Sequence, residues 1–315
     1  MTTKLSRILG VGQGLPKKCL TNDALIKKYQ LDSSHEWIQS RTGITQRYIC
    51  EEENVSSLAL LAAEQALKNA NFSAKEIDLI IVATCTPDSS FPSTAMKVQQ
   101  GLGCKNIPAF DLNAACSGFI YALHTADSLM KNGQGTTALV IGAECFSRIL
   151  DWQDRTTSIL FGDGAGAAVI RQEESNQGIL GAFIDGDGSG VDSLYASTTV
   201  GPVHMNGRDV FKYAVRAMGD IDEEWLKQYG IQKGDIDWVV PHQANVRILD
   251  AAAELAKIPH EKVVKTVQQH ANTSAASIPL ALSAAVEDGR LKQGDLVLLQ
   301  AFGAGFTWGQ MLIRW

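Results

Sequence analysis

Residues 72–82 are Phe72-Ser-Ala-Lys-Glu-Ile-Asp-Leu-Ile-Ile-Val82, a polar turn followed by a short apolar run of strand type. A shift of 159 residues, from 78 to 237, places this stretch on Ile231-Gln-Lys-Gly-Asp-Ile-Asp-Trp-Val-Val-Pro241 and puts Asp78 on Asp237. The two stretches share one plan and align without a gap. We therefore expect an internally duplicated fold.

The same shift aligns a second pair of segments. Gly135-Thr-Thr-Ala-Leu-Val-Ile-Gly142 falls on Gly294-Asp-Leu-Val-Leu-Leu-Gln-Ala301, again a polar turn followed by a buried strand. Between the strands each half carries a helix-like segment, residues 117–132 and 276–290, with small or apolar residues on nearly every face. Such helices are typically buried on all sides. Strand, helix and strand in both halves predict βαβ units with parallel strands.

The predicted fold class is therefore α/β, with two similar halves packed face to face. We place the boundary between residues 174 and 175, which gives halves of 1–174 and 175–315. A single copy boundary disfavours a solenoid, because solenoids need more repeats. Residues 186–206 interrupt the pattern, are rich in Gly, Ser and Thr, and are predicted to form a surface loop or lid. We expect the active site where the halves meet.

The composition is that of an ordinary soluble globular protein. The 315 residues are 45% hydrophobic and 20% charged, with a net charge of −6 and a pI near 5.5. This charge gives no reason to expect nucleic acid or an anionic membrane as a partner. The first apolar stretch is too short and glycine-rich for a signal peptide, and no run approaches the ~18 residues of a membrane span. We expect a cytoplasmic protein.

Six cysteines are scattered along the chain without the spacing of a zinc site or a disulfide framework, so we predict no metal and mostly buried thiols. Cys116 differs from the others. It lies in Asp111-Leu-Asn-Ala-Ala-Cys-Ser-Gly-Phe119, after a strand-like run and before the buried helix. Unpaired N–H groups at a helix N-terminus favour a thiolate, the form that a nucleophile needs. The alternative is a structural cysteine in a tight corner.

Two polar residues of the second half are candidate partners of Cys116. His242 follows the strand-like run 236–240, so we place it at the carboxyl end of a parallel strand, where α/β proteins bind ligands. Asn272 falls on Asn113 at the 159-residue shift. The cysteine corner and the asparagine corner are therefore predicted to be pseudo-symmetry mates.

These residues belong to seven motifs that occur in one order along the chain. They are Glu-Trp-Ile-Gln-Ser-Arg-Thr-Gly-Ile at 36–44, Phe-Pro-Ser at 91–93, Ala-Ala-Cys-Ser-Gly-Phe at 114–119, Phe-Gly-Asp-Gly-Ala-Gly-Ala-Ala at 161–168, Pro-His-Gln-Ala-Asn at 241–245, Asn-Thr-Ser-Ala-Ala-Ser at 272–277 and Phe-Gly-Ala-Gly-Phe-Thr-Trp-Gly at 302–309. In these motifs the chain resembles β-ketoacyl-acyl-carrier-protein synthase III, the CoA-primed member of the thiolase superfamily. The resemblance implies two duplicated βαβ halves packed as a five-layered α-β-α-β-α core.

The resemblance also implies a reaction, a decarboxylative Claisen condensation that initiates fatty-acid synthesis. Cys116 would take the acyl group from acyl-CoA. His242 and Asn272 would then donate hydrogen bonds to the thioester oxygen of malonyl-acyl-carrier protein and stabilise the enolate left by decarboxylation. Backbone N–H groups of Cys116 and Ala304 would hold the oxyanion of the acyl-enzyme. No cofactor is implied, because acyl-CoA is a substrate.

Further residues are assigned to binding by the same resemblance. Trp37 and an arginine would stack on the CoA adenine and Arg41 would bind phosphate, with Arg155 completing the group. Arg247 and Lys212 would meet the acidic carrier protein. The alternative for each is an ordinary solvated side chain.

Three phenylalanines match positions around the acyl pocket of the family. Phe146 and Phe161 would fill its end, and Phe91 would reach across a homodimer interface. Phe146 stands where a smaller aliphatic residue is common, which predicts a short pocket and a preference for acetyl to butyryl starters. Ala304 stands where glycine is usual, and a positive φ there would cost strain.

Other interpretations stay open. The order Cys, His, Asn also occurs in papain-like proteases, although their local cysteine signature is absent here. A non-catalytic scaffold would not need three polar residues converging at strand ends. Within the superfamily, the alternative is a thiolase-like acyltransferase or condensing enzyme of secondary metabolism with a different acceptor.

Overall fold

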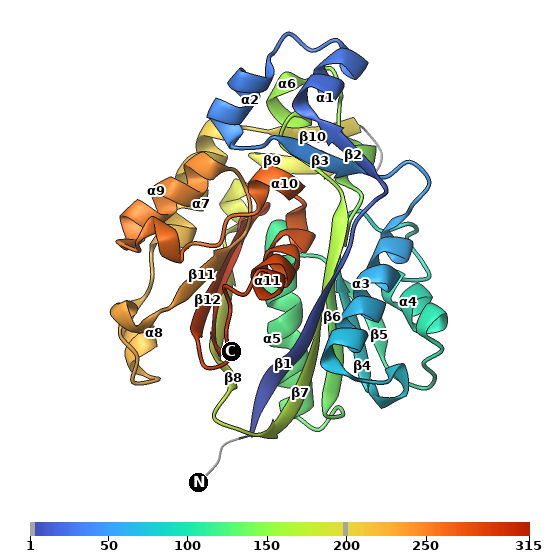
Figure 1. Ribbon diagram of the computed structural model, residues 1–315, viewed down its shortest axis with the longest axis vertical. Helices are drawn as coiled ribbons and strands as arrows, with labels where there is room; N and C mark the ends of the chain where they lie inside the picture. The colour runs from blue at the N-terminus through green and yellow to red at the C-terminus, as the bar shows by residue number, and fades with distance from the viewer. Residues whose placement is uncertain (1–3, 198–200) are drawn as a thin grey trace.

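Two β-sheets, one from each part of the chain, form the frame of the molecule (Figure 1). The computed structural model describes residues 4–197 and 201–315. The five-stranded sheet has the order β1-β7-β6-β4-β5 and the four-stranded sheet the order β11-β12-β13-β8. Their strands are β1 (Lys4–Gly14), β4 (Leu79–Ala83), β5 (Ala109–Leu112), β6 (Thr137–Glu144) and β7 (Gly164–Glu174), then β8 (Gly178–Gly186), β11 (Trp238–Pro241), β12 (Leu296–Gly303) and β13 (Thr307–Arg314).

Both sheets mix parallel and antiparallel neighbours. β4 is parallel to β5 and to β6, and β11 is parallel to β12, as crossover connections require. β7 runs antiparallel to β1 and β6, and β13 runs antiparallel to β12 and β8. The expectation of parallel strands therefore holds for the βαβ units alone.

Helices fill the space between the sheets and cover both outer faces (Figure 1). The middle layer is α5 (Gly118–Lys131) and α11 (Ser277–Glu287), whose apolar side chains pack with residues of both sheets. The outer layers are α3 (Val55–Ala70) and α4 (Thr94–Leu102) on one side and α8 (Glu223–Lys227) and α9 (Val246–Ala256) on the other. The predicted α-β-α-β-α order is confirmed.

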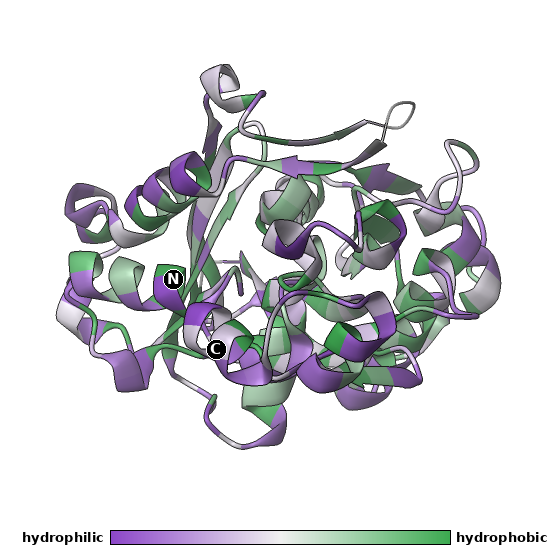
Figure 2. Ribbon diagram, turned by 90° about the horizontal axis from the view of Figure 1, so that it is seen from above, coloured by the Kyte–Doolittle hydropathy of each residue, from purple (hydrophilic) through white to green (hydrophobic). Residues whose placement is uncertain are grey.

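The outer helices are amphipathic rather than wholly apolar. In Figure 2 hydrophilic and hydrophobic residues alternate along the same helical ribbons. This is expected of helices that pack one face on a sheet and leave the other in water. Among residues 4–197 and 201–315, no helix combines the length and hydropathy that spanning a membrane requires.

The predicted repeat is present element by element. β4, α5 and β6 begin at residues 79, 118 and 137, and β11, α11 and β12 begin 159 positions later at residues 238, 277 and 296. Asp78 Oδ2 accepts a hydrogen bond from the N–H of Thr137 at 3.1 Å, and Asp237 Oδ2 accepts one from the N–H of Leu296 at 2.8 Å. The two aspartates thus fix equivalent strand starts.

The boundary between the halves falls in a short connection. β7 ends at Glu174 and β8 begins at Gly178, on either side of the predicted division between residues 174 and 175. The core between the sheets draws side chains from both halves, including Phe119 of α5 and Leu282 of α11. The division into two domains stays a prediction.

The expectation of a surface loop at residues 186–206 is only partly correct. β9 (Leu194–Ser197) and β10 (Gly201–Met205) pair as an antiparallel two-stranded sheet, and residues 198–200 of the predicted loop lie outside the described residues. Leu194, Val203 and Met205 line the cavity described below. The prediction weighted the Gly, Ser and Thr content of the segment and overlooked these apolar side chains, which are wholly or partly buried.

Three glycines on one face of β1 let α3 lie directly on the strand backbone. A Cβ on Gly10 would come within 2.4 Å of the Ala70 nitrogen, and one on Gly12 within 2.3 Å of the Ala66 nitrogen. On Gly14 it would lie 2.2 Å from the Leu58 carbonyl oxygen. No side chain can yield at these contacts, because the opposing atoms are backbone.

We predict that Gly12→Ala destabilises the protein by about 1–3 kcal/mol, because the added methyl group forces α3 away from β1. Urea denaturation at pH 7 measures the effect. Gly234→Ala is the matched control, since a Cβ there meets nothing within 4 Å, and it should change stability by less than about 0.5 kcal/mol. Equal midpoints for the two variants would show that α3 does not pack this closely.

Candidate active site

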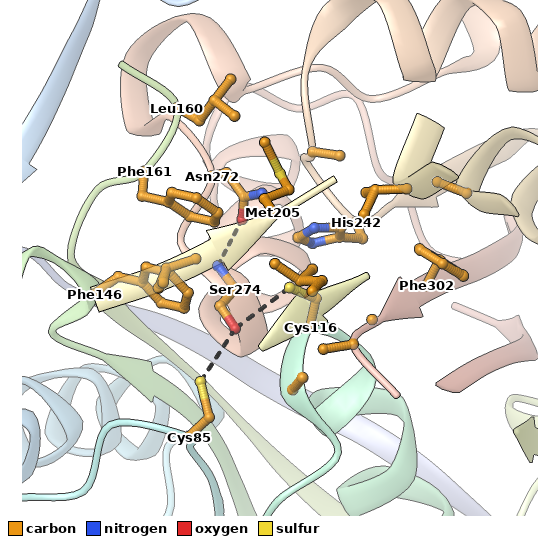
Figure 3. A pocket seen from close by; sticks show the side chains of 18 of the residues that line it. Cys85, Cys116, Phe146, Leu160, Phe161, Met205, His242, Asn272, Ser274 and Phe302 are labelled. Carbon is orange, nitrogen blue, oxygen red and sulfur yellow. Dashed lines mark hydrogen bonds between the residues drawn. The ribbon is translucent and has the colours of Figure 1, made fainter. Parts of the chain in front are cut away.

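A cavity of about 650 Å³ lies where loops from the two halves meet (Figure 3). Residues of both halves line it, and eight of them were singled out from the sequence: Arg41, Cys116, Phe146, Phe161, His242, Arg247, Asn272 and Ala304. The fold thus gathers side chains that are more than 250 positions apart, since Arg41 and Ala304 line the same space.

Cys116 lies in a tight corner between β5 and α5. It is the middle residue of the 3-10 turn η2 (Ala115–Ser117), which leads directly into α5. Ala115 has a left-handed φ of 46°, a conformation that costs a residue with a side chain about 1 kcal/mol and is concentrated at functional sites. The Asn113 Oδ1 atom accepts a hydrogen bond from the Ala115 N–H at 3.1 Å. The predicted position of Cys116 at a helix N-terminus is confirmed.

The helix N-terminus favours a thiolate at Cys116, but burial opposes this effect in the free protein. Burial raises the pKa of the Cys116 thiol to about 12, although a hydrogen bond to Ser274 acts in the opposite direction. The nearby Glu144 carboxyl raises the pKa further. Cys116 is therefore a neutral thiol near pH 7 and needs a proton acceptor before it can attack a substrate.

His242 stands immediately after β11 and is held by the neighbouring strand. Its backbone N–H donates to the Gln300 carbonyl oxygen of β12 at 2.7 Å. Its Nδ1 is buried without a hydrogen-bond partner among the described residues, and the residue lines the cavity. Burial lowers the pKa of His242 to about 3. The imidazole is therefore neutral and able to donate one hydrogen bond.

Asn272 connects the two halves through its backbone. Its N–H donates to the Leu160 carbonyl oxygen and its carbonyl oxygen accepts from the Gly162 N–H, both at 3.0 Å. Its Oδ1 accepts a hydrogen bond from the Ser274 N–H at 2.9 Å. Because the side-chain oxygen is engaged, the Nδ2 amide group is free to donate into the cavity.

The loop after β12 packs against the cysteine corner. A Cβ on Gly303 would lie 2.9 Å from the Cys116 nitrogen, so only glycine allows this approach. Ala304 follows and lines the cavity beside Cys116. The expected strain at Ala304 is absent, because the positive φ of this loop falls on Gly305, at 131°.

The three residues predicted to bind CoA lie together. Trp37 and Arg41 lie on α2 (His35–Thr42), and Arg155 begins α6 (Arg155–Ser158). The guanidinium carbons of Arg155 and Arg41 lie 4.8 Å and 5.9 Å from the centre of the Trp37 ring. Arg41 also lines the cavity, so this cluster adjoins its wall.

The two residues predicted to meet a carrier protein differ in position. Arg247 on α9 lines the cavity, with its guanidinium 5.9 Å from the Phe211 ring centre. Lys212 is exposed on α7 (Gly207–Gly219), next to Phe211 in the chain. It does not reach the cavity lining.

Of the three predicted acyl-pocket residues, two line the cavity. The rings of Phe146 and Phe161 are stacked with their centres 4.2 Å apart. Phe91 does not belong to the lining of its own chain and is 86% exposed. Its predicted role across a dimer interface stays a prediction.

Sequence reasoning missed two polar lining residues, Cys85 and Ser274, and the buried Glu144 to which both donate hydrogen bonds. The Cys116 thiol donates to Ser274 Oγ at 3.5 Å, and the Ser274 hydroxyl donates to Glu144 Oε1 at 3.1 Å. The Cys85 thiol donates to the same carboxylate oxygen at 3.3 Å. The available signal was an acidic residue at the end of the wholly buried strand β6.

Cys50, Cys145 and Asp163 could offer ligand atoms to a metal ion, since these atoms lie within 4.8 Å of one another. The prediction of no metal site overlooked this group because the three residues are far apart in sequence. The Asp163 carboxylate already accepts hydrogen bonds from the Cys50 N–H at 2.7 Å and the Ser147 N–H at 2.8 Å. We therefore assign no metal to this group.

Family models match two parts of the chain. Residues 110–188 match 3-Oxoacyl-[acyl-carrier-protein (ACP)] synthase III, and residues 226–315 match the C-terminal region of the same family. These parts contain Cys116 in the first case and His242 and Asn272 in the second.

Whole proteins of the same name are similar over nearly the full length. Beta-ketoacyl-[acyl-carrier-protein] synthase III of Erythrobacter litoralis is 54% identical, with 98% of each chain covered. The protein of the same name from Allorhizobium ampelinum is 52% identical, over 98% of this chain and 99% of the relative. The crystal structure of 3-oxoacyl-[acyl-carrier-protein] synthase III from Aquifex aeolicus superimposes with a TM-score of 0.94 at 49% identity, covering 98% of this chain and 100% of the other.

The buried His242 predicts a specific dependence of stability on pH. Its folded-state pKa lies below the ordinary value of 6.5, so the unfolded chain binds one more proton in acid. The free energy of unfolding therefore keeps its full contribution from neutral His242 above about pH 6.5, and it loses this contribution as the pH falls toward 3. Between pH 7 and pH 5 this group alone should reduce the unfolding free energy by about 2 kcal/mol.

Urea denaturation of the parent and of His242→Asn at both pH values tests this prediction. The loss between pH 7 and pH 5 should be about 2 kcal/mol smaller in the variant. Gln269→Asn, which changes an exposed side chain without a titratable group, should keep the pH dependence of the parent. Parallel curves for the parent and His242→Asn would mean that His242 is not buried in neutral form.

Proposed function

The chain belongs to the 3-oxoacyl-[acyl-carrier-protein] synthase III family, and from that membership we propose how its cavity performs the reaction. The enzyme initiates fatty-acid synthesis by condensing an acyl group from acyl-CoA with malonyl-acyl-carrier protein. The observation that carries the proposal is the presence of Cys116, His242 and Asn272 in one cavity. The chain is similar to synthase III proteins over nearly their full length, which disfavours the protease and scaffold interpretations.

In the first step Cys116 becomes acylated. Its sulfur attacks the thioester carbon of acyl-CoA, and CoA departs as the acyl group is transferred. The carbonyl oxygen becomes an oxyanion, which the backbone N–H groups of Cys116 and Ala304 stabilise. The close contact of Gly303 with the Cys116 nitrogen supports this arrangement, because it brings the two backbone segments together.

In the second step the carrier-bound malonyl group loses CO₂. His242 Nε2 and the Asn272 amide donate hydrogen bonds to its thioester oxygen and stabilise the enolate. Two features support these roles: burial keeps His242 neutral, and the Asn272 oxygen is already engaged by Ser274. The carbanion then attacks the acyl-Cys116 carbonyl. The step requires no cofactor, because acyl-CoA and the malonyl thioester supply all reacting groups.

Substrate binding is proposed for the residues around the cavity entrance. The Trp37 ring, with Arg155 beside it, offers a stacking surface for adenine, and Arg41 offers a charge for phosphate. Arg247 and Lys212 provide positive charge on α9 and α7 for an acidic carrier protein. A general acyl-transfer acceptor in secondary metabolism has no specific support among these contacts.

We predict that the three cavity residues separate the two steps. Cys116→Ala should lose the covalent acyl adduct, which intact-mass spectrometry detects after incubation with acetyl-CoA. His242→Ala and Asn272→Ala should keep the adduct but condense about 10²–10³-fold more slowly, because each removes one donor to the enolate oxygen. Release of CO₂ from malonyl-acyl-carrier protein measures this second step.

Cys104→Ala serves as the matched control, because Cys104 is a buried thiol outside the cavity lining. It should keep both the adduct and the condensation rate. An adduct that persists in Cys116→Ala, or condensation at the parent rate in His242→Ala, would contradict the assignment.

We also predict that acetyl to butyryl starters are preferred, because the stacked rings of Phe146 and Phe161 occupy the cavity wall. Overpacking by a longer chain costs about 1–3 kcal/mol, which is ~5- to 150-fold in binding. Phe146→Ala should extend the accepted length, as measured by kcat/KM for C2 to C10 acyl-CoAs. Phe110→Ala, outside the cavity lining, should keep the parent preference. A parent enzyme that favours C8 or longer would refute this prediction.

Phe91 supports a homodimer, because a phenylalanine ring with 86% exposure next to Pro92 is unfavourable in water. We propose that it inserts into the partner subunit near the acyl pocket. Sedimentation should give a dimer for the parent and weaker association for Phe91→Asp. Leu255→Asp, which changes an exposed leucine on α9, should remain dimeric. A parent protein that is a fully active monomer would rule the proposal out.

A further inference from the structure

A chain of hydrogen bonds leads from the Cys116 thiol through Ser274 to the buried Glu144. Figure 3 shows its first link, between Cys116 and Ser274. Its links are Cys116 to Ser274, at 3.5 Å, and Ser274 to Glu144, at 3.1 Å, and in each the proton points away from the cysteine. We propose that Ser274 relays the Cys116 proton to Glu144 during acylation, which makes Glu144 a positioning residue for the nucleophile. The inference rests on the proposed function of Cys116.

The thiol needs such an acceptor. With a pKa of about 12, raised chiefly by burial, only ~1 in 10⁵ molecules carries the thiolate at pH 7. His242 is proposed to act on the malonyl thioester instead, and among the described hydrogen bonds the Cys116 sulfur donates to Ser274. The pathway through Ser274 therefore starts at the reacting atom itself.

Glu144 lies in surroundings suited to a base. It ends β6, is fully buried, and accepts hydrogen bonds at both carboxylate oxygens from the Cys85 N–H, at 3.1 and 3.2 Å. Thr84 and Thr86 of the same loop also donate to Oε2. The titratable groups that face it are the Cys85 and Cys116 thiols. Burial raises the pKa of Glu144 above its ordinary value, which makes its carboxylate a stronger base.

The internal repeat indicates that these two polar groups are not needed for the fold. The residue equivalent to Ser274 in the other half is Ala115, which adopts nearly the same left-handed φ, 46° against 49°. The residue equivalent to Glu144, 159 positions on, is Gly303, also at the end of its strand. The same backbone is therefore built without a hydroxyl and a carboxyl. Only at the Cys116 side does the second half supply a hydroxyl, that of Ser274, and the first half a carboxyl, that of Glu144.

The spacing of the relay is fixed by backbone contacts. A Cβ on Gly142 of β6 would lie 2.2 Å from the Ala275 carbonyl oxygen, so the turn η7 (Ser274–Ala276) rests on the strand that carries Glu144. The Ser274 N–H is held by Asn272 Oδ1 at 2.9 Å. Ser274 therefore cannot move away from the carboxylate without displacing the Asn272 corner.

The protons balance over one catalytic cycle. As the Cys116 sulfur forms its bond to the acyl carbon, its proton passes to Ser274, and the Ser274 proton passes to Glu144. The bond from the acyl carbon to the CoA sulfur breaks, and the CoA thiolate takes a proton from water. During condensation the acyl–Cys116 bond breaks as the new carbon–carbon bond forms. The Cys116 thiolate released then recovers the proton from Glu144 through Ser274.

The test is the rate constant of acylation by acetyl-CoA, without malonyl substrate, from pH 5 to pH 10. In the parent the rate should be constant through the neutral range, because the Glu144 carboxylate, which accepts hydrogen bonds at both oxygens, takes the proton. In Glu144→Gln the rate at pH 7 should fall by at least ~10²-fold and then rise about tenfold per pH unit, because hydroxide must remove the proton. Ser274→Ala should lose the constant range in the same way, and Glu144→Asp should partly restore it.

Asp163→Asn is the matched control, because Asp163 is another buried carboxyl, bonded to Cys50 and Ser147 rather than to the relay. It should keep the constant range. Ser274→Ala also guards against misfolding of Glu144→Gln, since alanine already occupies the equivalent φ at Ala115. A Glu144→Gln profile that is lower but unchanged in shape would overturn the relay. If instead the parent forms no acyl-Cys116, the proposed function itself fails.

Discussion

The close packing of α5 and α11 between the two sheets is the constraint on which the site depends. Backbone meets backbone there: a Cβ on Gly142 would lie 2.2 Å from the Ala275 carbonyl oxygen, and one on Gly166 would lie 2.7 Å from the Leu280 nitrogen. Each helix starts from a turn whose first residue is held at a positive φ. Because the helices share one layer, those turns meet, and Cys116 comes to lie against Ser274, two residues from Asn272. The position of the catalytic side chains in this cavity therefore follows from the close packing of the two halves.

Exclusion of water has opposite effects on the groups in this cavity. It strengthens hydrogen bonds from His242 and Asn272 to a developing oxyanion, because the local dielectric is low. It also disfavours every charge, which keeps His242 neutral and the Cys116 thiol protonated. A neutral histidine suits a hydrogen-bond donor, whereas a protonated cysteine is a poor nucleophile. The relay through Ser274 reconciles the two demands, since it passes the thiol proton to a carboxylate that already carries a charge, so the total charge of the buried groups does not change.

The sequence predicted much of this arrangement because duplication can be recognised in one dimension. The shift that aligns Asp78 with Asp237 also locates β4, β6, β11 and β12, and it placed Asn272 opposite Asn113. Contacts between non-equivalent positions of the two halves could not be found in this way. Glu144 matches Gly303 at that shift, so its meeting with Ser274 depends on the packing of η7 on β6. The burial of Cys116, which opposes the thiolate, was missed for the same reason, because it arises from residues far along the chain. The β9–β10 pair escaped notice because its strands are only four and five residues long and lie in a segment rich in Gly, Ser and Thr.

The central claim is that the acyl group on Cys116 is an intermediate of the condensation. A chase experiment tests it most directly: the enzyme is acylated with ¹⁴C-acetyl-CoA, freed of CoA, and mixed with malonyl-acyl-carrier protein and excess unlabelled acetyl-CoA. The account predicts that the label leaves the protein within one turnover and appears in the β-ketoacyl product. Label that stays on the enzyme while unlabelled product accumulates would contradict it.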